Sequence, residues 1–244
     1  MIRTENLTKF YGGRCVVSGT EIIVKKGEVV GLLGPNGAGK TTTFYMITGM
    51  VQPNKGHVFF NNMEITNLPM FKRARLGIGY LPQETSVFRD LTVEQNLQLV
   101  LELLDLSKKE QQKKLEFLLS QFSIDHIRRT QAKNLSGGEK RRTEIARCLV
   151  LDPQFILLDE PFAGIDPIAV EDIQNIIRLL KRQGVGILIT DHNVRETLSI
   201  TDRSYLLYDG KVLKSGKTKD LISDEKVKKL YLGSHFKMDD INEE

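Results

Sequence analysis

Four short apolar segments of the chain each end at a polar or glycine-rich stretch. They are residues 28–33, 76–81, 155–158 and 185–190. Short continuous apolar runs that alternate with helical stretches predict buried parallel strands. Because ligands bind beyond the carboxyl ends of the strands in open parallel sheets, we expect the polar residues that follow these four segments to meet at one edge of one sheet.

Residues 90–151 show apolar positions at helical spacing instead. These positions recur three or four residues apart, at Leu115, Leu118, Leu119 and Phe122. Thr92 and Ser107 each precede a Glu or Gln by three residues, which is typical of capping boxes at helix starts. We therefore expect a helical subdomain over about 90–151, inserted into a core made of residues 1–89 and 152–244.

Two further stretches predict local structure near the start and the middle of the chain. Residues 3–7 and 21–24 have strand-like patterns on either side of a Gly12-Gly13 turn, which predicts antiparallel strands. The charged run at 108–114 is interpreted as a solvated helix face, because such runs are more often solvated than binding surfaces.

A later helix start is predicted from Asp166 and Pro167. An N-cap aspartate followed by a proline at the first helical position is a common helix start, since proline has no N–H to leave unsatisfied there. This helix is expected to run to about Gln183.

Composition narrows the classes of function. The chain has 244 residues, 40% of them hydrophobic, which is enough for one α/β domain with a subdomain. A net charge of +4, from 35 basic and 31 acidic residues, argues against a dedicated nucleic-acid binder. The sequence has no apolar run of about 18 residues that would span a membrane. We therefore expect any bilayer-spanning part of its machinery to come from other chains.

Two weaker signals favour a cytoplasmic location. Residues 1–5 lack the apolar region of a secretory signal, and Cys15 and Cys148 are not at a metal-binding spacing. Both cysteines are interpreted as reduced thiols.

A phosphate-binding loop is predicted from a complete G-x-x-x-x-G-K-[ST] motif. It consists of Gly34, Pro35, Asn36, Gly37, Ala38, Gly39, Lys40 and Thr41. The glycines allow backbone N–H groups to surround phosphates, Lys40 supplies a positive charge for the β- and γ-phosphates, and the Thr41 hydroxyl is a Mg²⁺ ligand. Thr42 is expected to contact the nucleotide too, at the start of a helix whose positive dipole end faces the anion. The alternative is a chance glycine-rich turn before a helix.

With this loop, the predicted fold class is α/β. We expect a P-loop NTPase (RecA-like) core with an antiparallel β subdomain and an inserted α-helical subdomain.

Asp159 and Glu160 follow the apolar segment 155–158 and precede a proline. Asp159 is placed to hold Mg²⁺ directly or through water, and Glu160 is the candidate general base for an attacking water. The alternative is a pair of surface carboxylates after a strand.

Gln83 and His192 follow two other strands of the same predicted edge. Gln83 is expected to contact the metal or the attacking water, although an isolated glutamine after a strand usually has no such role. His192 comes after an apolar strand and an aspartate, so we interpret it as a γ-phosphate sensor rather than a structural histidine.

Tyr11 is expected to stack on the adenine base. It follows a short strand and precedes two glycines, and aromatic side chains stack on base faces. Phe10 competes for this role, and ordinary packing is the alternative for both.

Ser136, Gly137 and Gly138 begin another helix. We expect a bare, glycine-flanked helix N-terminus that suits an anion, which gives the chain a second phosphate-binding element and predicts a site shared between two copies. Taken without the other motifs, a simple capped helix is the better interpretation.

The stretch Leu135-Ser136-Gly137-Gly138-Glu139, with the Gly34 loop and Asp159-Glu160, resembles the nucleotide-binding domains of ABC transporters over essentially the whole chain. The resemblance implies a head-to-tail homodimer with two ATP molecules between the copies. Each ATP would contact the Lys40 loop of one copy and Ser136 and Gly138 of the other. Asp166 matches a loop that communicates between the two sites in this family.

Longer stretches are similar to the ATPase subunits of bacterial lipopolysaccharide exporters. They are residues 42–46, 79–84, 162–168, 190–197 and 231–233 with Phe236. This resemblance implies two membrane permease subunits whose coupling helices dock in a groove on the ATPase. Phe88 and Arg89 match that groove.

The chain departs from this pattern at three places. Asp90 stands where a second basic residue is expected, which affects the charges available for partner docking. Cys148 replaces a smaller alanine, and the acidic tail beyond Lys237 has no counterpart.

The resemblance therefore implies an ATP- and Mg²⁺-dependent ATPase at the cytoplasmic face of the inner membrane that powers lipopolysaccharide extraction and export. A branched-chain amino acid importer is the nearest alternative. A soluble ABC protein that acts on ribosomes or DNA is the alternative from another class. A chain with a single domain and no basic stripe argues against this alternative.

Overall fold

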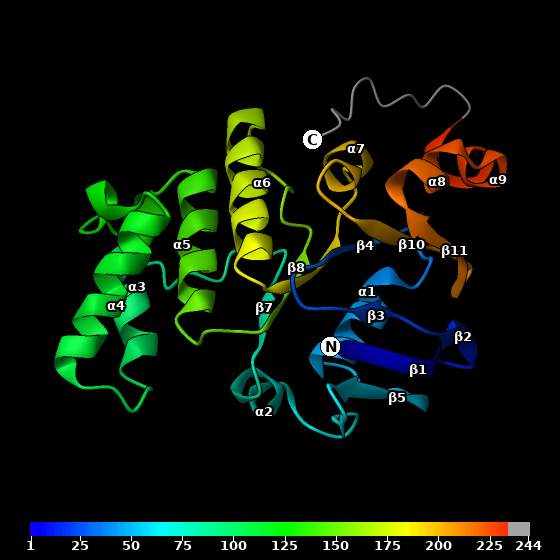
Figure 1. Ribbon diagram of the computed structural model, residues 1–244, viewed down its shortest axis with the longest axis horizontal. Helices are drawn as coiled ribbons and strands as arrows, with labels where there is room; N and C mark the ends of the chain where they lie inside the picture. Colours follow the sequence, from blue (N-terminus) through cyan, green and yellow to red (C-terminus); the bar gives the residue numbers. More distant parts are fainter. Residues whose placement is uncertain (234–244) are drawn as a thin grey trace.

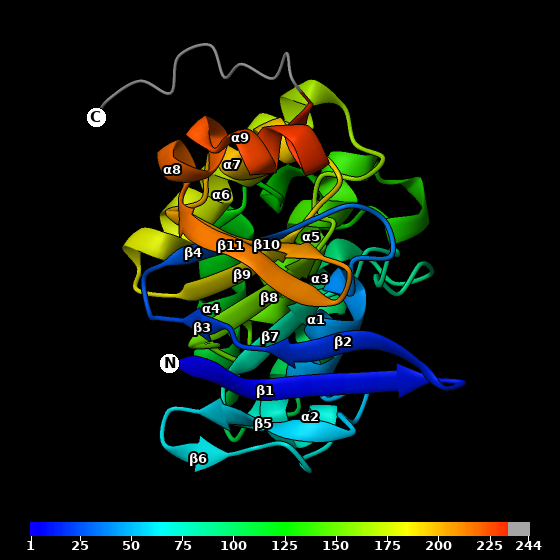
Figure 2. The ribbon, with the colours of Figure 1, turned by 90° about the vertical axis from the view of Figure 1, so that its right-hand side faces the viewer.

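A computed structural model describes residues 1–233 of the chain. Within these residues a six-stranded sheet has the order β11-β10-β4-β9-β8-β7 (Figures 1 and 2). Its strands are β4 Val29–Leu33, β7 Ile78–Leu81, β8 Phe155–Asp159, β9 Gly186–Thr190, β10 Arg203–Tyr208 and β11 Lys211–Lys217. All neighbours pair in parallel except β10 and β11, which form an antiparallel hairpin at one edge.

The four predicted apolar segments are the parallel strands β4, β7, β8 and β9, and they lie in one sheet as expected. The largest difference in their bounds is at β7, which begins two residues later than predicted. Leu76 is instead the C-cap of α2 (Met70–Arg75), and Gly77 follows with a positive φ of 103°.

A second, antiparallel sheet is built from the N-terminal part of the chain. Its strands are β1 Ile2–Tyr11, β2 Arg14–Thr20, β3 Ile23–Val24, β5 Lys55–Phe60 and β6 Met63–Glu64. The predicted antiparallel strands over 3–7 and 21–24 correspond to part of β1 and to β3, which pair with each other, but the prediction missed β2, the strand that directly follows the Gly12-Gly13 turn. Gly12 and Gly13 both have positive φ, as a two-residue hairpin turn requires, and Tyr11 therefore pairs directly with Arg14.

The helices pack on both faces of the six-stranded sheet. They are α1 Lys40–Thr48, α2 Met70–Arg75, α3 Val93–Leu101, α4 Lys108–Gln121, α5 Gly137–Leu149, α6 Pro167–Arg182, α7 Val194–Leu198, α8 Thr218–Ser223 and α9 Glu225–Val227, with shorter turns at Asp125–Ile127, Ala132–Asn134 and Lys228–Leu232. In Figure 1, α3, α4 and α5 lie at the left and the antiparallel sheet lies at the lower right. None of the helices within residues 1–233 combines the length and the apolar character that crossing a membrane requires.

Alternate residues of each central strand face different layers. Val30 and Leu32 of β4 belong to a core that includes Phe44 of α1 and the antiparallel sheet. Ile156 and Leu158 of β8 belong to the other core, which contains the apolar faces of α3 to α6. This two-residue period explains why the strands are apolar throughout, since both of their faces are buried.

The predicted helix starts at Thr92, Ser107 and Asp166 are confirmed. Thr92 and Ser107 each form both hydrogen bonds of a capping box. The Asp166 carboxylate accepts a hydrogen bond from the N–H of Ala169 at 3.0 Å, and α6 ends with Gln183 as its C-cap.

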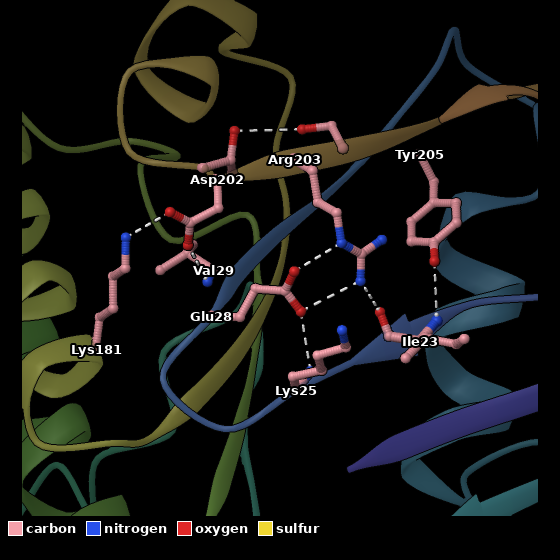
Figure 3. Close-up of polar contacts among 10 residues, drawn as sticks. Ile23, Lys25, Glu28, Val29, Lys181, Asp202, Arg203 and Tyr205 are labelled. Atoms are coloured by element: carbon pink, nitrogen blue, oxygen red, sulfur yellow. Dashed lines mark hydrogen bonds and ion pairs between the residues drawn. The ribbon is translucent and has the colours of Figure 1, made fainter. Parts of the chain in front are cut away.

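Polar side chains form hydrogen bonds and ion pairs where the antiparallel sheet meets the central one, as Figure 3 shows. Arg203 Nε donates to Glu28 Oε1 at 2.7 Å, and its Nη2 donates to the carbonyl oxygen of Ile23. The Tyr205 hydroxyl accepts from the Ile23 N–H at 3.1 Å. Asp202 accepts from the Val29 N–H at 2.9 Å. These contacts lie near the amino ends of the parallel strands, since Val29 and Arg203 are the first residues of β4 and β10.

Cys148 packs against Gly79 of β7. A Cβ on Gly79 would lie 2.6 Å from Cys148 Sγ, so the glycine makes room for a side chain larger than alanine. Burial raises the pKa of the Cys148 thiol to about 11, which keeps it protonated at neutral pH.

Candidate active site

The carboxyl ends of the parallel strands β4, β7, β8 and β9 lie side by side along one end of the central sheet, which is the edge that the sequence predicted for the site. Because these strands are parallel neighbours in register, the Gly34 loop, Gln83, Glu160 and His192 all follow strand ends at that edge. Side-chain contacts join Glu160 to both Gln83 and His192.

The Gly34 loop has the backbone geometry of a phosphate cradle. Gly34, Gly37 and Gly39 have φ values of 147°, 79° and 94°. Lys40 Nζ donates to the carbonyl oxygens of Gly34 and Pro35 at 2.7 and 3.1 Å, so the ammonium group lies against the loop. Burial lowers the pKa of Lys40, and the nearby Glu160 opposes that shift.

Helix α1 begins directly after this loop. Its N-cap is Gly39, which has no side chain to cap the first N–H groups, and its first turn contains no acidic residue. A helix start of this kind suits an anion, because both the free N–H groups and the helix dipole favour negative charge.

Glu160 lies at the centre of the polar contacts. His192 Nε2 lies 2.7 Å from its Oε1, and Gln83 Nε2 donates to its Oε2 at 2.6 Å. Its φ of 46° is unusual for a residue other than glycine, and such backbone strain clusters at functional sites. Burial raises the pKa of the Glu160 carboxyl, while the His192 charge opposes the shift.

Asp159, the last residue of β8, is buried, and one of its carboxylate oxygens accepts a hydrogen bond. Thr190 Oγ1 donates to Asp159 Oδ1 at 2.9 Å, which connects the ends of β8 and β9. Burial raises the pKa of Asp159, and the Thr190 hydrogen bond lowers it.

Asp191 has a role that the sequence did not reveal. Its carboxylate accepts from the N–H of Phe162 at 3.0 Å and from the N–H of Asn193 at 2.8 Å. It therefore connects the segment after Glu160 to the segment that carries His192. The one sequence signal is an aspartate two residues before the N-cap of α7, Asn193, and aspartate is common in such turns.

Tyr11, the candidate for adenine stacking, lies on another element. Tyr11 ends β1, is 48% exposed, and has the Lys9 ammonium 5.3 Å from its ring centroid. Phe10, its competitor, is also exposed.

The prediction of a bare helix start at Ser136 is wrong. Its side chain accepts from the Glu139 N–H at 3.3 Å, while Glu139 Oε2 accepts from the Ser136 N–H at 2.8 Å. Ser-Gly-Gly-Glu has the S-x-x-E spacing of a capping box, so α5 is capped by its own residues. Gly138 remains a close-packing position, since a Cβ there would lie 2.8 Å from the Ala169 Cβ.

Comparison with known proteins identifies this arrangement. Residues 17–163 match the family model described as "ABC transporter". The chain belongs to the ABC transporter family. Both the resemblance and the fold class predicted from the sequence are therefore confirmed, and the protein is an ATP-binding, ATP-hydrolysing subunit of an ABC transporter.

Several relatives match this ABC ATPase over nearly their full length. One, from Acidithiobacillus ferridurans, is named lipopolysaccharide export system ATP-binding protein LptB and is 54% identical, over 98% of this chain and 99% of its own. The LptB of Escherichia coli K12 is 50% identical, over 97% and 99%. An uncharacterized ABC transporter ATP-binding protein of Rhizobium meliloti is 55% identical, over 95% and 86%.

Solved structures show the same architecture. The ADP conformation of MJ1267, an ATP-binding cassette of an ABC transporter, superposes with a TM-score of 0.85 at 31% identity, and covers 96% of this chain and 99% of its own. The ATP-binding cassette MJ0796, described as dimeric and bound to ADP and Pi, gives a TM-score of 0.78 at 26% identity, over 89% and 99%.

A groove of this ABC ATPase lies beside the predicted partner-docking residues. A cavity of about 200 Å³ is lined in part by Tyr80, Ser86, Glu144, Arg147, Cys148 and Leu151. Phe88 is 47% exposed next to it, and the Arg147 guanidinium carbon lies 5.2 Å from the Phe88 ring centroid. Arg89 is exposed, while Asp90 pairs with Lys133 at 3.3 Å.

Proposed function

We propose that this ABC ATPase powers the extraction of lipopolysaccharide from the inner membrane and its export toward the outer membrane. The observation that carries the proposal is the near-complete coverage, at 50% identity or more, of relatives named as lipopolysaccharide export ATP-binding proteins. The chain would act peripherally, on the cytoplasmic face of the inner membrane.

Nucleotide binding is assigned to the Gly34 loop and the start of α1. The backbone N–H groups of the loop would surround the phosphates, with Lys40 against the β- and γ-phosphates. The other residues assigned to the nucleotide are Tyr11, Gly34, Asn36, Gly37, Ala38, Gly39, Thr41 and Thr42. Tyr11 would stack on the adenine, for which its exposed ring on the β1–β2 hairpin is suited.

The oxygen donors at the sheet edge suit Mg²⁺. Thr41, Gln83 and Asp159 offer a hydroxyl, an amide and a carboxylate oxygen, and Mg²⁺ at a nucleotide usually takes few protein ligands because phosphates and waters supply the rest. When bound, the ion would neutralise charge that develops on the phosphates.

Glu160 is assigned as the general base. Its Oε1 and Oε2 contact His192 and Gln83, and the raised pKa brings the carboxylate closer to the basicity that proton transfer at neutral pH requires. Glu160 would accept a proton from the attacking water, Gln83 would orient that water, and His192 would contact the γ-phosphate. No covalent intermediate is needed, since phosphoryl transfer depends mainly on position and electrostatics.

This assignment predicts the pH dependence of kcat. Burial raises the pKa of Glu160, so protonation of the base begins at a higher pH than for an exposed glutamate. As the pH falls through that raised value, kcat should decrease, and it should recover fully as the pH rises again. Steady-state kcat measured from about pH 5 to 8 checks this. A kcat that stays constant down to the pKa of an ordinary glutamate would contradict it.

The active unit is proposed to be a head-to-tail homodimer. Ser136, Gly137 and Gly138 of one copy would contact the ATP held by the Lys40 loop of the other, and Asp166 would connect the two sites. The capping box at Ser136 leaves the N–H groups of Gly137 and Gly138 in the first turn of α5, where they suit a phosphate.

Within this unit we assign residues 1–89 and 152–244 to the core and about 90–151 to the helical subdomain. The helical part contains α3, α4 and α5, and therefore carries Ser136. Its movement relative to the core would open and close the dimer.

Two membrane permease subunits are proposed to dock at Phe88 and Arg89. Phe88→Ala should leave the fold and the ATPase activity of the isolated chain intact, because the ring is half exposed, but should abolish association with the permeases. Co-purification and transport assays check this, and an exposed-phenylalanine control is Phe71→Ala on α2. Unchanged association together with unchanged transport would remove Phe88 from the docking site.

Partner identity tests the transported substrate. Tagged Glu160→Gln protein is purified from detergent-solubilised membranes and the accompanying chains are identified by mass spectrometry. Two distinct membrane subunits with periplasmic β-rich domains would support lipopolysaccharide export. Amino acid permease subunits would contradict it in favour of an importer, and stimulation of the ATPase activity of the wild-type chain by RNA or DNA would contradict the proposed role in export.

A further inference from the structure

A buried ion pair on α5 lies next to the loop that carries Gln83. Arg141 and Glu144 are 6% and 2% exposed, and Arg141 Nη1 lies 3.2 Å from Glu144 Oε2. Removing two charges from water is costly unless additional hydrogen bonds satisfy them. The additional contacts of this pair run mainly to residues 82–86.

Arg141 holds the peptide groups that precede two catalytic candidates. Its Nη1 donates to the carbonyl oxygen of Pro82 at 2.8 Å, and its Nη2 donates to that of Asp159 at 3.3 Å. Pro82 directly precedes Gln83, and Asp159 directly precedes Glu160. One guanidinium group therefore fixes both backbones relative to each other.

Glu144 holds the other end of the same loop. Its Oε1 accepts from the N–H of Ser86 at 2.5 Å and from the Ser86 hydroxyl at 3.3 Å. Residues 83–85, between the two attachment points, are exposed. Arg147 Nη2 also donates to Ser86 Oγ at 2.7 Å and lies over the Phe88 ring, so the docking residue is joined to the same place.

We propose that Glu144 is a positioning residue for ATP hydrolysis. Together with Arg141 it holds both ends of the 83–85 segment and so keeps the Gln83 amide against Glu160. The inference rests on the proposed roles of Gln83 and Glu160. It goes further in assigning to one buried carboxylate the alignment of the attacking-water site.

The same contacts give a route from the partner surface to the site. Arg147 packs over the Phe88 ring and donates a hydrogen bond to the Ser86 hydroxyl oxygen. The Ser86 N–H in turn donates to Glu144. A partner that displaces Phe88 would move Ser86, and with it the loop that carries Gln83. Helix α5 begins at the proposed second phosphate site, so its movement would reach Gln83 through the same ion pair.

The decisive variant is Glu144→Gln in the full chain. Glutamine keeps the size and an acceptor for the Ser86 N–H. However, its NH2 group would then face Arg141, and the lost negative charge leaves the buried guanidinium group uncompensated. We expect kcat to fall about 10- to 100-fold through misplacement of Gln83. The KM for ATP should change by less than about twofold, because the Lys40 loop is untouched. Glu102→Gln, at an exposed glutamate that caps α3, is the matched control.

Hydrogen exchange provides a readout that does not depend on turnover. The Ser86 N–H donates to the Glu144 carboxylate, and the neutral oxygen of glutamine is a weaker acceptor. Peptides covering residues 82–88 should therefore exchange faster in Glu144→Gln than in the wild-type chain, while peptides from β4 and α1 should not change. A merely structural role predicts a different pattern, with lowered Tm, raised KM and faster exchange throughout the domain.

Ser86→Ala keeps the test decisive if Glu144→Gln does not fold. This variant removes the hydroxyl that contacts Glu144 and Arg147 without leaving a buried charge unpaired. It should lower kcat severalfold at unchanged KM. Where Glu144→Gln does fold, the effect of Ser86→Ala should largely disappear in the Ser86→Ala/Glu144→Gln double variant, because residues that act through one contact are not additive.

Wild-type kcat and wild-type exchange over residues 82–88 in Glu144→Gln would overturn the inference, as would a uniform loss of stability. If Glu144→Gln does not fold, wild-type kcat in Ser86→Ala would overturn it. A wild-type chain without ATPase activity would instead contradict the proposed function, and the exchange measurement would then decide whether Glu144 holds the loop.

Discussion

Glu160→Gln is expected to lower kcat for ATP hydrolysis by about 10²- to 10⁴-fold, which is the usual contribution of a general base. Glutamine has nearly the same volume, and its one amide oxygen can keep one of the two hydrogen bonds, from Gln83 or from His192, so the site should remain assembled. It cannot accept a proton from water. Steady-state hydrolysis together with equilibrium ATP binding measures the two effects separately.

ATP binding by this variant should trap the closed homodimer. The Lys40 loop is unchanged by the substitution, and the charge lost from Glu160 removes repulsion toward the γ-phosphate. Size-exclusion chromatography with light scattering should therefore show an ATP-dependent dimer that persists in Glu160→Gln and is transient in the wild type. Glu102→Gln is the control for replacing a glutamate by a glutamine elsewhere in the chain. Turnover by Glu160→Gln within about twofold of the wild type would mean that another group is the base.

The converging sheet edge was predictable from sequence because each strand is buried on both faces. Such strands are apolar throughout, so the polar residues at or just beyond their ends, Gln83, Asp159 and His192, stand out along the chain. Parallel pairing then places them at one edge without knowledge of any contact. What sequence could not give is the pairwise geometry, such as Gln83 and His192 on opposite oxygens of Glu160.

The N-terminal hairpin shows why local patterns fail in a half-exposed sheet. β2 alternates exposed, partly buried and buried residues, with a bulge in its pairing with β1. Its pattern is therefore weaker than that of the buried strands, and the sequence prediction missed β2, although it found the Gly12-Gly13 turn and the antiparallel strands β1 and β3. The masking of a signal by irregular pairing is expected where one face of a sheet is solvated.

The Arg141–Glu144 pair illustrates a different limit. Two opposite charges three residues apart on a helix usually indicate a solvated surface pair of little energetic importance. Here α5 packs against β7 and α6, and its tertiary position buries both groups. Sequence spacing is the same in the two cases, so only the structure separates a surface pair from one that holds the Gln83 loop. Proposed residues in the tail, such as Phe236, lie outside the described residues 1–233.

Gly34→Ala is expected to lower both the stability of the fold and the affinity for ATP. A Cβ at this position would lie 2.2 Å from the carbonyl oxygen of Leu207 on β10, and the φ of 147° is one that alanine rarely adopts. Backbone strain and overpacking together should cost about 3 kcal/mol or more. For a chain of this length that corresponds to a decrease in Tm of roughly 6–12 °C.

Gly37→Ala separates the contributions of strain and space. Gly37 also has a positive φ, of 79°, but a Cβ there meets no atom within 4 Å. Its cost should be the conformational part alone, about 1–2 kcal/mol. Differential scanning calorimetry of the two variants should therefore place Gly34→Ala clearly below Gly37→Ala. Equal Tm values would show that β10 yields to the added methyl group. In that case the close approach of Leu207 would not be what requires glycine at the first position of the phosphate-binding loop.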